Sequence, residues 1–331
     1  MDQVALHKAV EFLVRCAVAA PSADNSQPWG FRDSADGLRV VYDQARVAGT
    51  TFAADEPATL LSVGAVLENL RAGAAAAGIA LDVERWPDDA ASYARVTVRE
   101  IPANGLAAEA SQAALFHRHT NRHPYRSTPI PAPVMQRSGG LFENRARVVW
   151  LPRKRHADMA DLVRRASRIR FQTREVHEWL AKSLRFTPAE AAAGDGLDLA
   201  TLALPPGGAA LLASIDAQPI RSAPGLVGIV APSAVDDVID AGSLMQRLWI
   251  QLNREGLAVH PYYVVPDQLD RLARGRVSAR FRAGLEQLSE ECAQLFGLGQ
   301  DERLQMLLRV GFPKKVAVLS RRLEPSRLTG G

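Results

Sequence analysis

Arginines paired with hydroxyl residues offer the clearest chemistry in this sequence. Arg118, Thr120 and Arg122 alternate within one short string, and Arg321 and Arg322 form a pair near the C-terminal end. A guanidinium group binds a phosphate through two parallel hydrogen bonds, and a threonine hydroxyl can support it. These residue types suit a small phosphorylated anion. The same arginines on a surface turn would ordinarily be solvated charges, so both readings stay open at this point.

A second candidate is the polar segment 20–29, Ala-Pro-Ser-Ala-Asp-Asn-Ser-Gln-Pro-Trp. Its two prolines fix φ and keep the segment out of a helix. Ser22 and Asn25 can bond their own backbone or present hydroxyl and amide groups to a ligand. Trp29 can anchor the loop in the core with one large ring. The segment is thus either a rigid helix-to-strand turn or a ligand-contacting loop.

Three stretches together resemble parts of one known family. Residues 21–29, Pro-Ser-x-x-Asn-Ser-Gln-Pro-Trp, resemble the flavin-contact loop of the FMN-dependent nitroreductases. Residues 118–125, Arg-His-Thr-Asn-Arg-His-Pro-Tyr, look like the phosphate-binding string that begins nitroreductase domains. Residues 320–322, Ser-Arg-Arg, resemble the basic pair that closes the same phosphate pocket. The resemblance covers most of the chain, and the loop and the string carry it.

The order of these motifs indicates two fused halves. In the family the phosphate string precedes the first helix, whereas here it follows a complete helix-loop-strand half. The resemblance is therefore closest to the Acg-type tandem subfamily. It implies an α+β, nitroreductase-like fold in which residues 1–108 and 109–331 form a pseudo-dimer. Mixed, mainly antiparallel sheets and long packed helices are expected.

An internal repeat agrees with this division. A helix-glycine-strand unit occurs twice, with Gly64 matching Gly242 and Gly78 matching Gly256. Such units are generic in chains that mix helices and strands, so the repeat supports the tandem without establishing it.

The resemblance also implies which residues contact FMN. Arg118, Thr120 and one of the two terminal arginines would hold the phosphate, and Arg122 would stabilise the reduced ring. The loop would cover the ring edge and ribityl chain. Residues 260–263, His-Pro-Tyr-Tyr, occupy the place where the family carries an acidic-glycine pair, which puts the contact to flavin N5 in question. The expected cofactor-binding residues are Pro21, Ser22, Asn25, Arg118, His119, Thr120, Arg122, Pro261, Tyr262, Arg321 and Arg322.

The implied activity is an FMN-dependent oxidoreductase. NADH or NADPH would donate hydride to flavin N5, and a nitroaromatic, quinone or similar electron-poor small molecule would accept it. No side-chain nucleophile is needed, and His119 and His123 lack the spacing and carboxylate partner of a metal site. Two alternatives remain open. One is a flavin-holding or regulatory protein with little turnover, with residues 187–208 as a candidate lid. The other is a vestigial pseudo-dimer without flavin.

Apolar periodicity predicts the elements that must position these residues. Helices are expected over residues 3–19, 59–77, 157–184, 236–255 and 279–296, and a short helix is expected just before the string. Strands are expected over residues 30–32, 38–42, 79–85, 93–98, 147–151, 226–231, 257–265, 305–311 and 316–319.

Composition limits the class of protein. The chain has 331 residues, of which 47% are hydrophobic and 23% charged, as in an ordinary globular protein. Its net charge of +4 and the absence of a recognised motif argue against nucleic-acid binding. No apolar run approaches the ~20 residues of a membrane span, and the N-terminal residues do not resemble a secretory signal. Cys16 and Cys292 are expected to be reduced thiols in the core, so a cytoplasmic protein is expected. The fused arrangement is compatible with a monomer.

Overall fold

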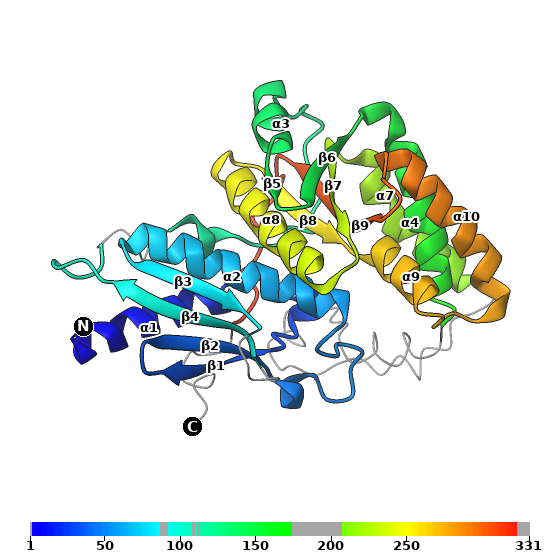
Figure 1. Ribbon diagram of the computed structural model, residues 1–331. Coiled ribbons are helices and arrows are strands. Elements are labelled where there is room, and N and C mark those ends of the chain that lie inside the picture. Colours follow the sequence, from blue (N-terminus) through cyan, green and yellow to red (C-terminus); the bar gives the residue numbers. More distant parts are fainter. Residues whose placement is uncertain (1, 87–91, 108–109, 111–112, 174–206, 323–331) are drawn as a thin grey trace.

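The computed structural model describes residues 2–86, 92–107, 110, 113–173 and 207–322, and its fold is α+β (Figure 1). Two sheets lie on either side of a central pair of long helices. The first has the strand order β1-β2-β4-β3 and the second the order β5-β6-β7-β9-β8. The α+β prediction is confirmed, and all pairings between these strands are antiparallel.

Residues of the N-terminal third build the first sheet and the helices against it. The helices are α1 (Gln3–Val18) and α2 (Pro57–Ala77), and the short 3-10 helices are η1 (Ala23–Asn25) and η2 (Gln44–Val47). The strands are β1 (Trp29–Ser34), β2 (Gly37–Tyr42), β3 (Ala80–Arg85) and β4 (Ser92–Glu100). The helix α2 begins with a proline in its first turn and ends at Gly78, whose φ of 74° favours glycine.

The rest of the described chain forms the second sheet and its helices. The strands are β5 (Phe142–Glu143), β6 (Ala146–Leu151), β7 (Gly225–Pro232), β8 (Ala258–Tyr262) and β9 (Glu302–Gly311). The helices are α3 (Ala132–Gly139), α4 (His156–Arg170), α7 (Gly208–Ser222), α8 (Val235–Arg254), α9 (Val264–Ala273) and α10 (Ala279–Phe296). Two 3-10 helices, η4 (Ala114–His117) and η5 (Arg153–Arg155), complete this part.

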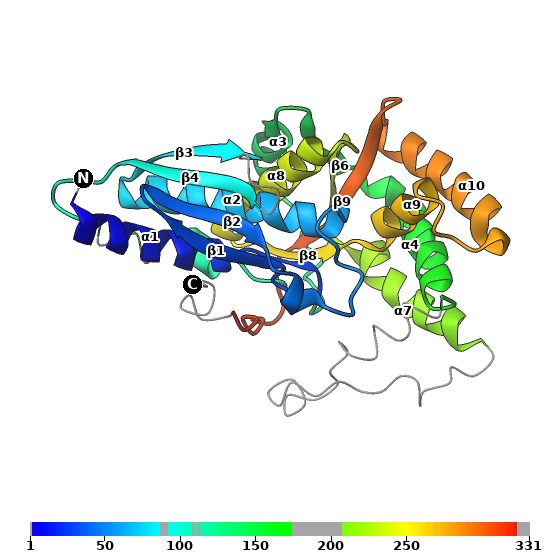
Figure 2. The same ribbon diagram turned by 60° about the horizontal axis from the view of Figure 1, so that its bottom comes forward.

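The strand β7 shows why the second sheet is covered on both faces. All of its residues are buried. Val227 and Ile229 pack into the cluster that contains α8, whereas Leu226 and Val230 pack into the cluster that contains α4 and α10. Side chains alternate across a strand, so a continuous apolar run requires a layer on each side. The two views agree on these layers (Figures 1 and 2).

The two central helices, α2 and α8, approach each other most closely at a pair of glycines. A Cβ atom added to Gly64 would lie 2.0 Å from the carbonyl oxygen of Ile239, and one added to Gly242 would lie 2.2 Å from that of Leu61. The Ser243 hydroxyl donates to the Gly64 carbonyl at 2.9 Å across the crossing. Gly64 and Gly242 are equivalent positions in the two copies of the internal repeat. The two copies therefore contact each other at corresponding positions where the helices cross.

A buried polar chain links α1 to both central helices. Asn69 is fully buried, and its side-chain amide donates to the carbonyl of Cys16 at 2.8 Å. Gln246 in turn donates its side-chain amide to Asn69 Oδ1 at 2.6 Å. Buried amides need partners of this kind, and here they fix the end of α1 relative to α8.

Several expected elements differ from the structure. The predicted helix over residues 157–184 is present as α4 and ends at Arg170, and residues 174–184 lie outside the described part. The predicted strand over residues 257–265 ends at Tyr262, because Pro266 fits the first turn of α9 and the apolar run before it is helical. The predicted strand over residues 316–319 is wrong. That segment has no strand partner, and Val316 and Val318 are 89% and 91% exposed.

Three helices, α3, α7 and α9, were not expected from the sequence. The division at residues 108 and 109 stays a prediction, although the first sheet uses only residues before it and the second only residues after it. Residues 187–206 of the candidate lid lie outside the described part, and the next two residues lead into α7. Among the described helices, none has the length and apolar character needed to cross a bilayer.

The helix crossing gives a first testable prediction. Gly64→Ala should lower the free energy of unfolding by at least about 1–3 kcal/mol, because its Cβ would meet backbone atoms that cannot move independently. Urea denaturation measures this loss. Gly284→Ala on α10 is the matched control, since a Cβ there meets nothing within 4 Å and alanine favours a helix. Equal losses in both variants would contradict the close crossing.

Candidate functional site

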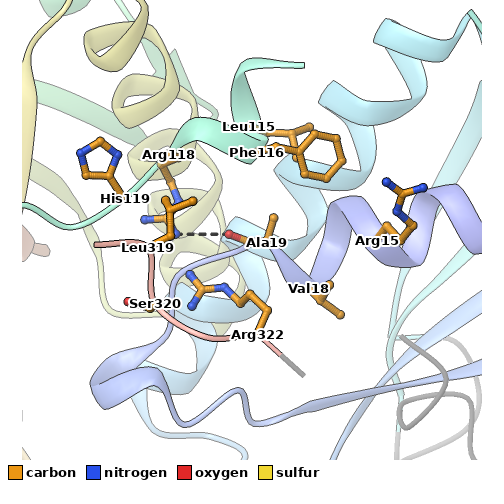
Figure 3. Close-up of a pocket in the computed structure, with 10 residues that line it drawn as sticks. All are labelled: Arg15, Val18, Ala19, Leu115, Phe116, Arg118, His119, Leu319, Ser320 and Arg322. Carbon is orange, nitrogen blue, oxygen red and sulfur yellow. Dashed lines mark hydrogen bonds between the residues drawn. The ribbon is translucent and has the colours of Figure 1, made fainter. Parts of the chain in front are cut away.

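A hollow of about 390 Å³ opens where the end of α1 meets η4 and the C-terminal segment (Figure 3). Its walls come from segments that are far apart in the sequence. The residues that line it are Arg15, Val18, Ala19, Leu115, Phe116, Arg118, His119, Leu319, Ser320 and Arg322. The volume lies within the range of about 300–1,000 Å³ that is typical of small-molecule sites.

Arg118 is the deepest charged residue of this hollow. Its side chain is only 4% exposed, and its Nη2 donates to the carbonyl of Ala19 at 3.2 Å. The guanidinium carbon lies 4.6 Å from the ring centre of Trp249, which gives a cation–π contact. Its Nε and Nη1 atoms are buried without a hydrogen-bond partner among the described residues. Two donors of a buried cation are therefore left for a ligand.

The charges around Arg118 make this site suited to an anion. Burial, followed by the neighbouring Arg322, lowers the pKa of Arg118 to about 9. Burial also lowers the pKa of Arg322. No aspartate or glutamate is among the described residues that line the hollow, and Arg15 is a third arginine among them. An unpaired buried charge is costly, and a phosphate oxygen could accept a charge-assisted hydrogen bond from either of the two free donors.

The loop 20–29 has a strained backbone. Asp24, Asn25 and Gln27 have φ angles of 49°, 59° and 49°, in the left-handed region that non-glycine residues seldom occupy. The loop is held by the backbone N–H of Gln27, which donates to Ser22 Oγ at 2.9 Å, and by Trp29, whose side chain is fully buried. Strain of this kind persists only where surrounding contacts enforce it, and it is concentrated at functional sites.

Asn25 joins this loop to the C-terminal segment. Its Nδ2 donates to the carbonyl of Arg321 at 2.9 Å, and its Oδ1 accepts from Arg322 Nη1 at 2.5 Å. Both atoms of the amide are thus engaged within the protein. We call this pair of hydrogen bonds the Asn25 clasp. It brings the loop and the terminal arginines together beside Arg118.

Residues 118–125 lie along the edge strand β8. Thr120 forms a parallel bridge with Val259, and the backbone N–H of Asn121 donates to the Val259 carbonyl at 2.9 Å. Asn121 is fully buried, and its amide donates to the carbonyl of Lys315 at 2.9 Å. Arg309 on β9 donates to the carbonyl of His123 at 2.7 Å. The string is therefore fixed to the second sheet and to the C-terminal segment at once.

The far end of the string carries a second group of ionisable residues. Arg122 is exposed and close enough to Asp24 and His260 to shift both pKa values. Burial, with Arg122 and Arg309, holds the pKa of His260 well below its usual value, so this imidazole is neutral near pH 7. Desolvation raises the pKa of Asp24 although part of its side chain is exposed, and Arg170 and Arg122 oppose that rise.

Most of the sequence-predicted residues thus lie in or beside the hollow, whereas Tyr262 packs into the core cluster that contains α4 and α10. Arg118, His119 and Arg322 line the hollow, whereas Arg321 is exposed and contributes its backbone carbonyl to the Asn25 clasp. Pro21 and Ser22 lie in the adjoining loop, and Thr120 and Arg122 follow along the string. Pro261 and the buried Tyr262 lie on β8, beyond Thr120. Whether these residues bind FMN stays a prediction.

Three contributors were missed by sequence reasoning. Arg15 stands in the last turn of α1, Phe116 precedes the string, and Trp249 lies on α8 beneath Arg118. Only Phe116 carried a usable signal, because it lies two residues before the string. The convergence of α1 and α8 on Arg118 depends on tertiary packing that no local pattern shows.

Comparisons with known proteins agree with the motifs. No family model matches the chain. Among solved structures, it is similar to an FMN-bound nitroreductase from Bacteroides fragilis, with a TM-score of 0.39 and 10% identity over 63% of this chain and 91% of that one. It is also similar to the FMN-dependent nitroreductase NfnB from Mycobacterium smegmatis in complex with NADPH, with a TM-score of 0.38 and 16% identity over 62% and 89%. TM-scores this low assign no residue's role.

Sequence relatives give a closer match. An uncharacterised protein of Mycobacterium tuberculosis is 26% identical over 94% of this chain and 47% of its own length. The "Putative NAD(P)H nitroreductase acg" of the same organism is 30% identical over 39% of each chain. The predicted resemblance to an Acg-type nitroreductase is confirmed by this sequence match. The chain spans less than half the length of these relatives, so their activities are not transferred to it.

The Asn25 clasp gives a second prediction. Asn25→Gly removes the amide while suiting the left-handed backbone, so it should loosen the C-terminal segment without straining the loop. Tryptic cleavage after Lys314 or Lys315 should become at least about fivefold faster, because two hydrogen bonds are lost. Asn144→Gly is the control, since Asn144 has a φ of 48° and bonds Asp240 instead. Unchanged cleavage in Asn25→Gly would show that the clasp does not hold the segment.

The buried cation gives a third prediction, on pH. Inorganic phosphate should raise the melting temperature at pH 7 to 8, where Arg118 is charged. The stabilisation should fade as the pH rises through about 9, because the folded-state pKa of Arg118 lies there and the neutral form loses its attraction for the anion. Thermal unfolding with and without phosphate measures the effect. A phosphate-induced shift that persists undiminished to pH 10 would argue against Arg118 as the anion ligand.

Proposed function

We propose that this protein is an FMN-dependent oxidoreductase that uses NADH or NADPH to reduce nitroaromatics, quinones or similar electron-poor small molecules. One observation carries the proposal: Arg118 is a buried cation with two donors that have no partner among the described residues, and the described lining of the hollow has no carboxylate. The phosphate of FMN carries the charge and the oxygen acceptors that this arrangement lacks. The resemblance to nitroreductases at the loop and the string supports FMN over other phosphorylated ligands.

The chain's own residues would bind and orient the cofactor. Arg118 and Arg322 would take the phosphate from two directions, and Ser22 and Thr120 would adjoin the ribityl chain. Arg122 would place its charge at the ring end, where it favours negative charge on the reduced flavin. The low pKa of His260 would keep its imidazole neutral near pH 7, so it would add no charge beside the flavin ring. When bound, FMN supplies two-electron transfer between a nicotinamide donor and the acceptor.

The organisation of the chain as a pseudo-dimer belongs to the same proposal. The equivalent glycines of the internal repeat meet where α2 crosses α8, as expected of two fused halves. The loop comes from the first half, and the string and the terminal arginines come from the second. One site would then be complete within a single chain, and a second subunit would not be required for binding.

A flavin-holding protein with little turnover is the second candidate. The Asn25 clasp favours it, because the C-terminal segment is tied to the loop directly beside the phosphate-binding residues. A segment held in this way would slow the exchange of flavin and restrict access to it. The two candidates share the binding site and differ in whether electrons pass to an acceptor.

The binding site is tested with Arg118→Met. We expect the affinity for FMN to fall about ten- to a hundredfold, because a charged hydrogen bond contributes about 1.5–3 kcal/mol. Quenching of flavin fluorescence measures the dissociation constant. Arg32→Met is the control, since Arg32 is exposed on β1 and does not line the hollow. Equal affinity in the wild type and Arg118→Met would overturn the assignment.

Turnover separates the two candidates. Purified protein loaded with FMN should oxidise NADH or NADPH faster when a quinone or a nitroaromatic is added. A yellow protein that stays oxidised under excess NADPH would support the flavin-holding function. A colourless protein that gains no flavin spectrum on addition of FMN would contradict both.

A further inference from the structure

We infer that the site accepts flavin adenine dinucleotide, with the adenylate half in the part of the hollow lined by Arg15 and Phe116. This inference rests on the proposed flavin function, and it names a second phosphate subsite beside the one at Arg118. It follows from the direction of the string, the depth of the arginines and the nature of the walls.

The direction of the string orders the site from one end to the other. Phe116 lies at the α1 side, where Figure 3 shows its ring on the same side of the hollow as Arg15. Arg118 follows in the middle, above Trp249. Arg122 lies at the far end, near His260. A flavin ring toward Arg122 and a phosphate at Arg118 would therefore leave the phosphate's outer oxygens facing Arg15.

The arginines also become more exposed in that direction. Arg118 is buried, Arg322 is half-buried and Arg15 is exposed. Arg15 forms no ion pair among the described residues, whereas many other arginines of the chain pair with a carboxylate. A single phosphate monoester engages the inner two arginines. A pyrophosphate extends the negative charge outward, so that the third arginine also gains a partner.

The outer walls suit an adenine ring. Leu115 and Val18 are buried with apolar surface toward the hollow, Phe116 is half-buried, and Leu319 is 58% exposed. Aromatic rings and the planar guanidinium group both stack on a purine. The exposed side chain of Leu319 would lose water contact if a flat ring covered it.

The size of the hollow is consistent with an adenylate group beside the phosphate. At about 390 Å³ the hollow falls in the range of about 300–1,000 Å³ of pockets that hold whole small molecules, so a phosphate group alone would fill only part of it. The hollow does not contain the region near His260, where the flavin ring is proposed to lie, because no residue beyond His119 on the string lines it. The remaining space therefore lies on the side of the phosphate that faces away from the flavin ring.

The test compares the dissociation constants of FMN and FAD for the full chain, measured by flavin fluorescence and by calorimetry. The wild type should bind FAD at least as tightly as FMN. Arg15→Ala should weaken FAD about tenfold, as expected for the loss of a charge-assisted contact, and should change FMN less than about twofold. Lys8→Ala is the matched control, because Lys8 is exposed on the same helix, outside the hollow.

The outcomes separate the inference from the proposed function. If FMN binds and FAD does not, or if Arg15→Ala weakens both flavins equally, the adenylate subsite is wrong and the FMN site stands. If neither flavin binds the wild type, both proposals fail. Circular dichroism of Arg15→Ala confirms that a loss of FAD binding does not come from unfolding of α1.

Discussion

The structure around the hollow depends on one costly interaction, the burial of the Arg118 guanidinium with no carboxylate partner in the described part of the chain. A cation of this kind is tolerated only when the fold is held together by other contacts. Here the ring of Trp249, the carbonyl of Ala19 and the fixed path of the string supply those contacts. The remaining donors stay pre-positioned, so a bound anion would meet them without further ordering of the side chain.

The central helices explain how this geometry is maintained. The helix α8 carries Trp249, and the end of α1 carries Ala19, so Arg118 is fixed by two helices from opposite parts of the chain. The buried chain from Cys16 through Asn69 to Gln246 ties those same helices together. Close approach at Gly64 and Gly242 lets the helices pack at short range. The helix contacts that pack the core therefore also position the guanidinium group of Arg118.

Much of this organisation could be read from the sequence, for physical reasons. Long helices such as α8 and α10 show clear apolar periodicity, whereas α2 was found as a long apolar segment that is buried over most of its length. The glycines that end or cross these helices have few alternatives. The loop and the string were found because their residue types are unusual and closely spaced. Their convergence followed only from the resemblance, since nothing local in the chain relates Ser22 to Arg118.

The differences arise where local patterns are ambiguous. The apolar segment 316–319 has the composition of a strand, yet it finds no partner and stays exposed. Residues 264–266 continue an apolar run but begin a helix, because proline is favoured in a first turn. The assignment of Asn25 to the flavin stays a prediction, and in the structure both of its amide atoms bond to the terminal arginines. Contacts between distant segments decide such cases.

A crystal structure of the full chain with FMN tests the central claim most directly. We expect a phosphate oxygen within about 2.7–2.9 Å of Arg118 Nε or Nη1, the spacing of a charge-assisted hydrogen bond, with Trp249 still beneath the guanidinium. A flavin bound elsewhere, or a phosphate that leaves both nitrogen atoms without a partner, would contradict the account.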